Sequence, residues 1–139
     1  MGKVAVITLM LFLGSCLASY GQSQLQKEMK SQSMLKIAEA VICTDVSERT
    51  PSGIARSFPP DIKKLYCFTK IVGATKETFV KHLWYFDRQM MAEVMLPVKS
   101  VRWRTYSSKR ILPQWQGLWK VEIQDENGQV LTTLDFEIR

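Results

Sequence analysis

Apolar and polar residues alternate with a period of two along most of the chain after residue 36. Successive side chains of a β-strand point to opposite faces, so this period predicts strands that bury one face and expose the other. The pattern is clearest over residues 101–106. There Val101, Trp103 and Thr105 fall on one face of the expected strand, and Arg102, Arg104 and Tyr106 fall on the other.

Six further segments show strand-forming patterns, at residues 37–46, 65–72, 78–87, 89–96, 118–124 and 130–138. Residues 81–96 also contain Met, Ala and Glu, which favour helix, but the β-branched and aromatic residues around them favour a strand. Residues 47–60 contain three prolines and a glycine, which predict a loop. Seven strands at this spacing predict an all-β fold, an immunoglobulin-like antiparallel β-sandwich.

The last two strands are expected to form a hairpin. The segment Asp125-Glu126-Asn127-Gly128 joins them, and its Asn-Gly pair favours the positive φ at both central positions that a type I′ turn needs. The alternation that follows predicts five inward residues in the last strand: Val130, Thr132, Leu134, Phe136 and Ile138.

Residues 1–21 have the features of a secretory signal peptide. Lys3 follows the initial Met, and residues 4–13 form an apolar run too short to span a bilayer. Two cleavage sites compete. The segment Leu13-Gly14-Ser15-Cys16 resembles a bacterial lipobox, which would make Cys16 the lipid-bearing first residue, whereas Ser19-Tyr20-Gly21 would permit cleavage before Gln22. Both predict export, to the periplasm or to an outer-membrane anchor.

Residues 22–36 are rich in Gln, Ser and Lys and are expected to form a flexible tether or one frayed helical turn. The sandwich is expected to occupy residues 37–139 as one domain. The net charge of +6 and the pI near 9.3 suit an anionic partner. Because export makes nucleic acid a poor partner, we expect an envelope protein or an anionic glycan instead.

Cys43 and Cys67 lie on two predicted strands, and export would place them in an oxidising compartment. They are a disulfide candidate if their Cα atoms lie within about 7 Å, and the bridge would contribute roughly 3 kcal/mol in the chain-entropy model. The alternative is two buried free thiols. Two cysteines and a single histidine do not make a zinc set, so no metal or cofactor is expected.

The second half of the chain contains five distinctive features: His82-x-Trp84, Trp103-Arg104-x-x-Ser107-Ser108-Lys109, Pro113-x-Trp115-x-Gly117-x-Trp119, Asp125-x-x-Gly128-x-Val130-Leu131 and Phe136. With these features it resembles a bacterial family known as domain of unknown function 2914. Upstream, Glu48-Arg49-x-Pro51 and Tyr66-x-Phe68-Thr69 look like earlier family segments, which extends the resemblance to residues 37–138. It implies an envelope or membrane-attached module without an assigned activity, and Cys43 and Cys67 lie outside its motifs.

No pattern of residues indicates catalysis. His82 shares a strand face with Trp84, and the simplest interpretation is a half-buried histidine that a backbone carbonyl satisfies; a ligand-binding role is the alternative. The 13 carboxylates are scattered, and the chain has no nucleophile elbow, phosphate loop or metal spacing. We therefore expect a protein that is not an enzyme.

One cluster of cations stands out as a candidate binding surface. Lys99, Arg102, Arg104, Lys109 and Arg110 lie close together with no acidic residue among them. Arg102 and Arg104 share a face and would receive a carboxylate or phosphate, with Ser107 and Ser108 as further donors. The alternative is a solvated strand face.

Trp115 lies in a loop between Pro113 and Gly117, where it is either an exposed platform or a plug over one end of the sandwich. Two functions follow from these candidates. The first is a protein-interaction module that uses the basic strand and the aromatic loop. The second is a carbohydrate-binding module in which Trp115 and the arginine pair hold an anionic envelope glycan.

Overall fold

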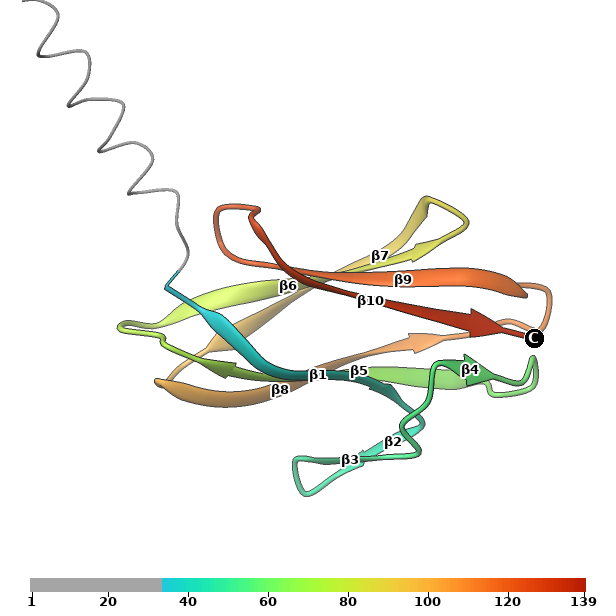
Figure 1. The fold of residues 1–139 in the computed structure, drawn as a ribbon, viewed down its shortest axis with the longest axis horizontal. Coiled ribbons are helices and arrows are strands. Elements are labelled where there is room, and N and C mark those ends of the chain that lie inside the picture. The colour runs from blue at the N-terminus through green and yellow to red at the C-terminus, as the bar shows by residue number, and fades with distance from the viewer. Residues whose placement is uncertain (1–33) are drawn as a thin grey trace, which may run out of the picture. The chain divides into compact units, whose positions relative to one another are not determined.

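The computed structural model describes residues 34–139, which form ten β-strands joined by loops (Figure 1). The expected signal peptide, the lipidation candidate Cys16 and the tether up to residue 33 lie outside the described residues. Across the described part, no helix has the length and apolar character that crossing a membrane requires. The strands are β1 (Lys36–Cys43), β2 (Asp45–Ser47), β3 (Thr50–Ser52), β4 (Ser57–Phe58), β5 (Lys64–Val72), β6 (Thr78–Phe86), β7 (Gln89–Val98), β8 (Arg102–Arg110), β9 (Gly117–Gln124) and β10 (Val130–Ile138).

The seven long strands are the seven that the alternation predicts, and they form two layers (Figure 1). One sheet has the order β1-β5-β8, and the other has the order β4-β10-β9-β6-β7. The first, second and fifth long strands therefore share one sheet, and the third, fourth, sixth and seventh share the other. This division is that of an immunoglobulin fold with strands A, B and E facing strands C, C′, F and G. The predicted all-β sandwich is confirmed.

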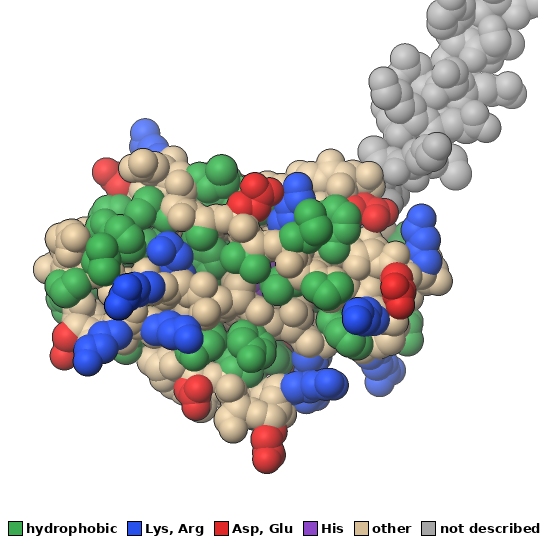
Figure 2. Space-filling view, turned by 180° about the vertical axis from the view of Figure 1, so that it is seen from behind, with side chains coloured by type: hydrophobic (Ala, Val, Ile, Leu, Met, Phe, Trp, Pro, Cys, Tyr) green, Lys and Arg blue, Asp and Glu red, His purple; other side chains and the backbone are tan. Residues whose placement is uncertain are grey.

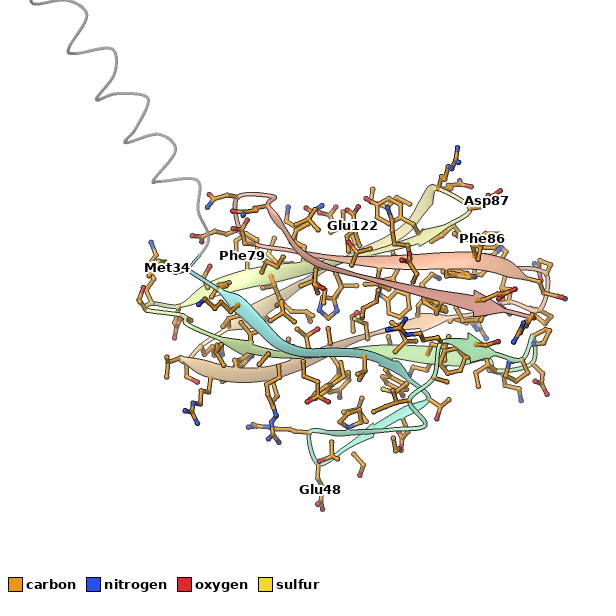
Figure 3. All side chains as sticks on the ribbon, viewed as in Figure 1. Met34, Glu48, Phe79, Phe86, Asp87 and Glu122 are labelled. Carbon is orange, nitrogen blue, oxygen red and sulfur yellow. The ribbon has the colours of Figure 1, made fainter. Side chains whose placement is uncertain are left out.

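The core lies between the two layers, where inward side chains of both sheets meet (Figure 3). Trp84, Trp119 and Phe136 form its aromatic centre, with the rings of Trp119 and Phe136 stacked at 5.8 Å between centroids. Leu65 and Ile71 of β5 face them and are fully buried. Burial of each such side chain stabilises the fold by about 2 kcal/mol, so the period-two pattern is also the main source of stability.

The predicted loop over residues 47–60 is wrong in part, because it contains two short strands and the last residue of β2. β2 and β3 pair as a hairpin with a two-residue turn, and β4 pairs in parallel with β10. The turn residues Glu48 and Arg49 have φ of 49° and 59°, values usually left to Gly or Asn. Three-residue strands are too short to show alternation, so the sequence carries no signal for this hairpin.

The β2–β3 hairpin contacts β1 and β5 beside the outer face of the β1-β5-β8 sheet (Figure 1). Phe68 alternates with the inward residues Cys67 and Thr69 and lies outside the core cluster, yet it is only 2% exposed. Its side chain therefore lies on the outer face of the sheet, beside which the hairpin packs. Glu48 marks the hairpin tip and points away from both layers (Figure 3).

Two details of the last hairpin differ from the prediction. Gly128 has a φ of 80°, but Asn127 is not among the described residues with positive φ, so the turn is not type I′. Instead Asp125 organises it, since its Oδ1 accepts hydrogen bonds from the backbone N–H of Asn127 and Gln129. A bulge between Val130 and Thr132 then shifts the register, so that Val130 is exposed and Leu131 packs on the core.

Of the two alternatives for Cys43 and Cys67, a disulfide or two buried free thiols, the structure has the free thiols. In the β1–β5 ladder Ile42 lies opposite Cys67, and Cys43 lies opposite Tyr66. Directly opposed residues share a face, so the two thiols point to opposite faces of the sheet. At the other end of β1 the fold begins slightly earlier than residue 37, with Leu35 buried and Lys36 already paired.

Candidate functional site

A groove of about 470 Å³ opens on the outer face of the β1-β5-β8 sheet. Four cations line it together with three other residues: Arg49, Lys70, Arg102, Arg104, Val72, Ser100 and Trp103. The β5–β8 ladder aligns this set, because Lys70 lies opposite Arg104 and Val72 lies opposite Arg102. The predicted pair Arg102 and Arg104 is therefore one wall of a larger basic site.

Arg49 reaches the groove from the tip of the β2–β3 hairpin, more than fifty positions before Arg102. Its positive φ belongs to the tight turn that places its side chain there. A non-glycine residue in this backbone region costs stability, and such strain tends to be kept at functional positions. Arg49 and Lys70 were not predicted as site residues, although the alternation in residues 65–72 turns Lys70 outward.

The cations of the groove are poorly neutralised. Lys70 Nζ lies 3.6 Å from Glu39 Oε2 in an ion pair that is partly exposed to solvent. Within residues 34–139, none of the arginines Arg49, Arg102 and Arg104 has an ion pair. Guanidinium groups left without an acid are suited to bind a carboxylate or phosphate through paired hydrogen bonds.

The same outer face changes from basic to aromatic and back to basic along β8. Tyr106 packs edge to face against Tyr66 at 5.8 Å between ring centroids, and Lys64 Nζ lies 5.1 Å from the Tyr66 ring centre. Arg110 lies opposite Lys64 at the far end of the ladder. Seen from behind, where β7 and β8 come nearest the viewer, Lys and Arg side chains gather towards both ends of the molecule (Figure 2).

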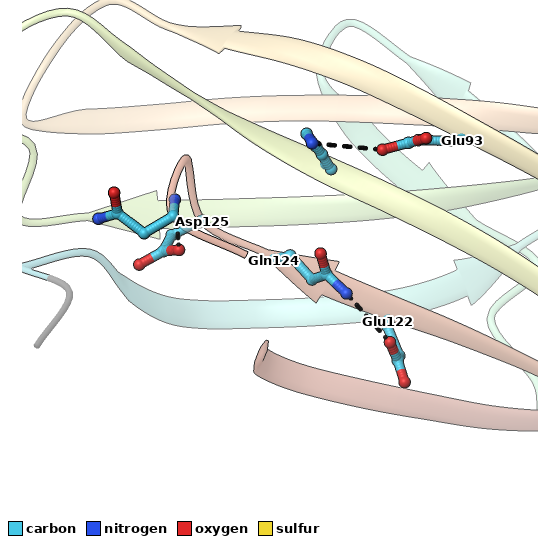
Figure 4. Close-up of polar contacts among 6 residues, drawn as sticks. Glu93, Glu122, Gln124 and Asp125 are labelled. Carbon is cyan, nitrogen blue, oxygen red and sulfur yellow. Dashed lines mark hydrogen bonds and ion pairs between the residues drawn. The ribbon is translucent and has the colours of Figure 1, made fainter. Parts of the chain in front are cut away.

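The outer face of the other sheet is different, because two of its lysines form ion pairs with neighbouring glutamates. Lys81 Nζ lies 3.3 Å from Glu93 Oε1, and Lys120 Nζ lies 3.2 Å from Glu122 Oε1. Gln124 Nε2 also donates to Glu122 Oε2 (Figure 4). A groove of about 640 Å³ on this face includes Lys120 and Glu122. Its charged residues are of both signs, whereas those that line the groove beside Arg102 and Arg104 are all cations.

Ser107 does not join the arginines, contrary to the prediction. It is buried on the inner face of β8, because it is an odd number of positions from Arg102 and Arg104. There its Oγ lies 2.7 Å from His82 Nδ1 and accepts a hydrogen bond from Trp84 Nε1 at 3.0 Å. His82 Nε2 lies 3.0 Å from Thr69 Oγ1. Two hydroxyl groups, rather than the backbone carbonyl we expected, satisfy a fully buried histidine.

One set of donors and acceptors accounts for the contacts among these four side chains. Trp84 Nε1 can only donate, so the Ser107 hydroxyl donates its own hydrogen to His82 Nδ1. The Nε2–H of His82 then donates to Thr69 Oγ1. We assign this tautomer because it gives the Ser107 hydrogen an acceptor, while the Thr69 hydroxyl has the Cys67 sulfur as its own acceptor. Burial lowers the pKa of His82 to about 4, so the ring is neutral at physiological pH.

The remaining candidates lie apart from the groove. Ser108 is exposed opposite Tyr66. Lys109 Nζ lies 4.9 Å from the centre of the Trp115 ring, and burial lowers the Lys109 pKa. Trp115 is half-buried against Trp119 beyond the C-terminal end of β8, while Arg102 begins that strand. Nine strand residues span about 30 Å, so Trp115 and the arginine pair do not form the single glycan site that the sequence suggested.

No group of three or more His, Cys, Asp or Glu in residues 34–139 is arranged to hold a metal ion. The fold and the groove thus define a class: an immunoglobulin-like β-sandwich with a basic, solvent-open site on one sheet. Residues 77–138, which run from β6 to β10, match the family described as "Protein of unknown function (DUF2914)". The upstream segments around Glu48 and Tyr66 lie outside the matched residues.

Two solved structures illustrate the distant similarity of this chain to known folds. A Niemann-Pick type C2 protein from the Japanese carpenter ant is 11% identical with a TM-score of 0.43, over 78% of this chain and 96% of that chain. A beta-glucosidase from Listeria innocua in complex with laminaribiose is 8% identical with a TM-score of 0.42, over 76% of this chain and 16% of that chain. No curated protein matches the sequence. Likenesses this weak carry no argument about function.

Proposed function

We propose that this protein is a non-catalytic interaction module of the cell envelope that binds an acidic segment of another protein in the Arg49–Arg104 groove. By that name we mean the site lined by Arg49, Lys70, Arg102 and Arg104. The signal-peptide features of residues 1–21 support export, either lipid-anchored at Cys16 or secreted. Export in turn supports a partner in the envelope.

The observation that carries the proposal is that three arginines from separate elements, none with an ion pair among the described residues, surround one open groove. Arg102 and Arg104 come from β8, and Arg49 comes from the β2–β3 turn. Like charges repel, so bringing them together costs stability unless a ligand neutralises them. A run of Asp or Glu side chains would do so and would gain paired hydrogen bonds.

The surroundings of the histidine support a binding role rather than catalysis. His82 is the single histidine of the chain, and it is enclosed between the sheets by Thr69 and Ser107. A general acid or base has to reach its substrate. The thiol of Cys67 is also buried, and desolvation raises its pKa to about 12, which disfavours the reactive thiolate.

A titration with an acidic peptide tests this function. The protein, obtained by expressing the full chain, is titrated with a labelled peptide of about ten residues rich in Glu, and the affinity is followed as salt is raised. The double variant R102Q/R104Q is expected to bind at least about tenfold more weakly, because two charge-assisted contacts are lost. The matched control K76Q/K120Q removes the same charge elsewhere and is expected to bind like the unsubstituted protein.

Three outcomes would overturn the proposal. The peptide fails to bind, both double variants lose affinity alike, or an acidic polysaccharide binds in the groove while acidic peptides do not. The last outcome would assign the groove to an anionic glycan instead. Equal losses in the two variants would mean that net charge alone, and not the groove, attracts the peptide.

A further inference from the structure

The strand that carries Arg102 and Arg104 is an edge strand. In the sheet order β1-β5-β8, β8 pairs with β5 on one side and with no described strand on the other. β8 has nine residues, and its register with β5 is unbroken from Arg102 to Arg110. Regular edge strands present a row of backbone N–H and C=O groups to which another chain can pair.

The phase of the ladder tells which backbone groups face the open side. Gly73 N–H donates to Val101 C=O at 3.0 Å, in line with the β5–β8 pairing. In an antiparallel ladder each residue directs both of its backbone groups towards the partner or both away, in alternation. Since Val101 faces β5, the backbone groups of Arg102, Arg104, Tyr106, Ser108 and Arg110 face the open edge.

Two of these five positions are already in use. Ser100 Oγ donates to Arg102 C=O at 2.7 Å, and Lys109 Nζ donates to Arg110 C=O at 3.2 Å. Within residues 34–139, no hydrogen bond reaches Arg104, Tyr106 and Ser108 from the open side. The three central residues therefore offer three N–H and three C=O groups. β7 does not cover these backbone groups. The two strands lie close together only near the loop that joins them, and they diverge along the length of β8 (Figure 1).

The residues with free backbone groups are also those whose side chains point to the basic outer face. Arg104 lines the groove, and Tyr106 and Ser108 are exposed beside it. Trp103 and Thr105 alternate with them and are half-buried towards the inner face. A strand laid along this edge would set every second side chain beside the cations and the others towards Trp103.

We propose that the acidic partner binds by adding an extended strand to the β8 edge, with its carboxylates on the outer face beside Arg102 and Arg104. The proposal rests on the proposed function of the Arg49–Arg104 groove. Backbone pairing supplies affinity, and the alternation of acidic and apolar side chains supplies selectivity. The ligand class is thus an extended segment in which Asp or Glu alternates with apolar or small residues.

Charge argues against a second copy of this chain as the occupant. β8 contains Arg102, Arg104, Lys109 and Arg110 and no acidic residue, so pairing two β8 strands would place cations beside cations. The same cations protect the edge from non-specific pairing. An acidic strand, by contrast, would be attracted to these cations.

Two isomeric peptides test the strand addition. Both alternate Glu with Val and Thr over about ten residues, a length that matches β8. One is N-methylated at the Glu residues, and the other at the Val and Thr residues. A paired strand directs only alternate N–H groups to its neighbour, so methylation at only one of the two sets of positions removes hydrogen bonds to β8. These positions are the Glu residues if the peptide pairs antiparallel, and the Val and Thr residues if it pairs parallel. We expect one isomer to lose at least about tenfold in affinity and the other to keep it.

Hydrogen exchange on the bound protein gives a second measurement. The amides of Arg104, Tyr106 and Ser108 should gain protection from the unmethylated peptide, while those of Trp103, Thr105 and Ser107 should be protected before it is added. If binding depends on Arg102 and Arg104 but the two isomers bind equally and the three amides stay unprotected, strand addition is overturned and the proposed function stands. If the unmethylated peptide does not bind at all, both fall.

Discussion

His82 Nδ1 lies 2.7 Å from the hydroxyl oxygen of Ser107, and this contact joins the two sheets of the sandwich. His82 belongs to β6 in one sheet and Ser107 to β8 in the other. Together with Thr69 and Trp84 they form a connected polar group within the core. A satisfied polar group of this kind fixes one arrangement of the two layers, because any other leaves donors unpaired.

The first prediction is a loss of stability in mild acid. The unfolded chain binds a proton at His82 near pH 6.5, whereas burial holds the pKa of the folded protein at about 4. As the pH falls from about 6.5 to about 4, the unfolded state therefore binds a proton at His82 and the folded state does not. The free energy of unfolding should therefore reach its full value above about pH 6.5 and should be lower by about 3 kcal/mol near pH 4.

Urea unfolding at a series of pH values checks this. In a His82→Gln variant that still folds, the portion of the pH dependence between pH 6.5 and 4 should be reduced. An unfolding free energy that is flat over this range in the unsubstituted protein would contradict the buried neutral histidine.

The second prediction concerns two neighbouring serines. Ser107→Ala should lower the free energy of unfolding by about 2–4 kcal/mol, because it leaves both Trp84 Nε1 and His82 Nδ1 without partners in the interior. Ser108→Ala is the matched control, since Ser108 is exposed, and should change stability by no more than about 0.5 kcal/mol. Chemical denaturation compares them, and equal effects would refute the network.

The third prediction is that Cys43 and Cys67 are unbridged. Both thiols are buried, and desolvation raises the pKa of each, so a thiol reagent should label neither in the folded protein. After unfolding without a reducing agent, both should be labelled. Intact mass measures this directly. A protein that takes up label only after reduction would contain the disulfide and would require a different arrangement of β1 and β5.

The fourth prediction separates strain from function at the hairpin tip. Arg49→Gly should raise the free energy of unfolding by about 1 kcal/mol, because glycine accepts a φ of 59° without strain. The same change should weaken binding of the acidic peptide, because one cation leaves the groove. Glu48→Gly is the control: it relieves the same kind of strain but keeps Arg49, so affinity should not fall. If Arg49→Gly leaves affinity unchanged, Arg49 is no part of the site.

Much of the fold followed from the sequence because alternation is a local property. All seven long strands were predicted, since each is long enough to repeat the period. Short elements failed for the converse reason: β2, β3 and β4 have two or three residues and show no period. The bulge at Val130 was likewise missed, because one extra residue in a ladder depends on the partner strand.

By itself the sequence determined the seven strands, the inward face of β8 and the excess of cations over acids. Only the tertiary structure decided which of those cations meet. Arg49 and Lys70 join Arg102 and Arg104 because strand pairing brings β5 against β8 and a hairpin folds over the sheet. It also separated Trp115 from the arginines and placed Ser107 with His82. Alternation assigns a residue to a face, but the neighbours on that face are set by register and by packing between sheets.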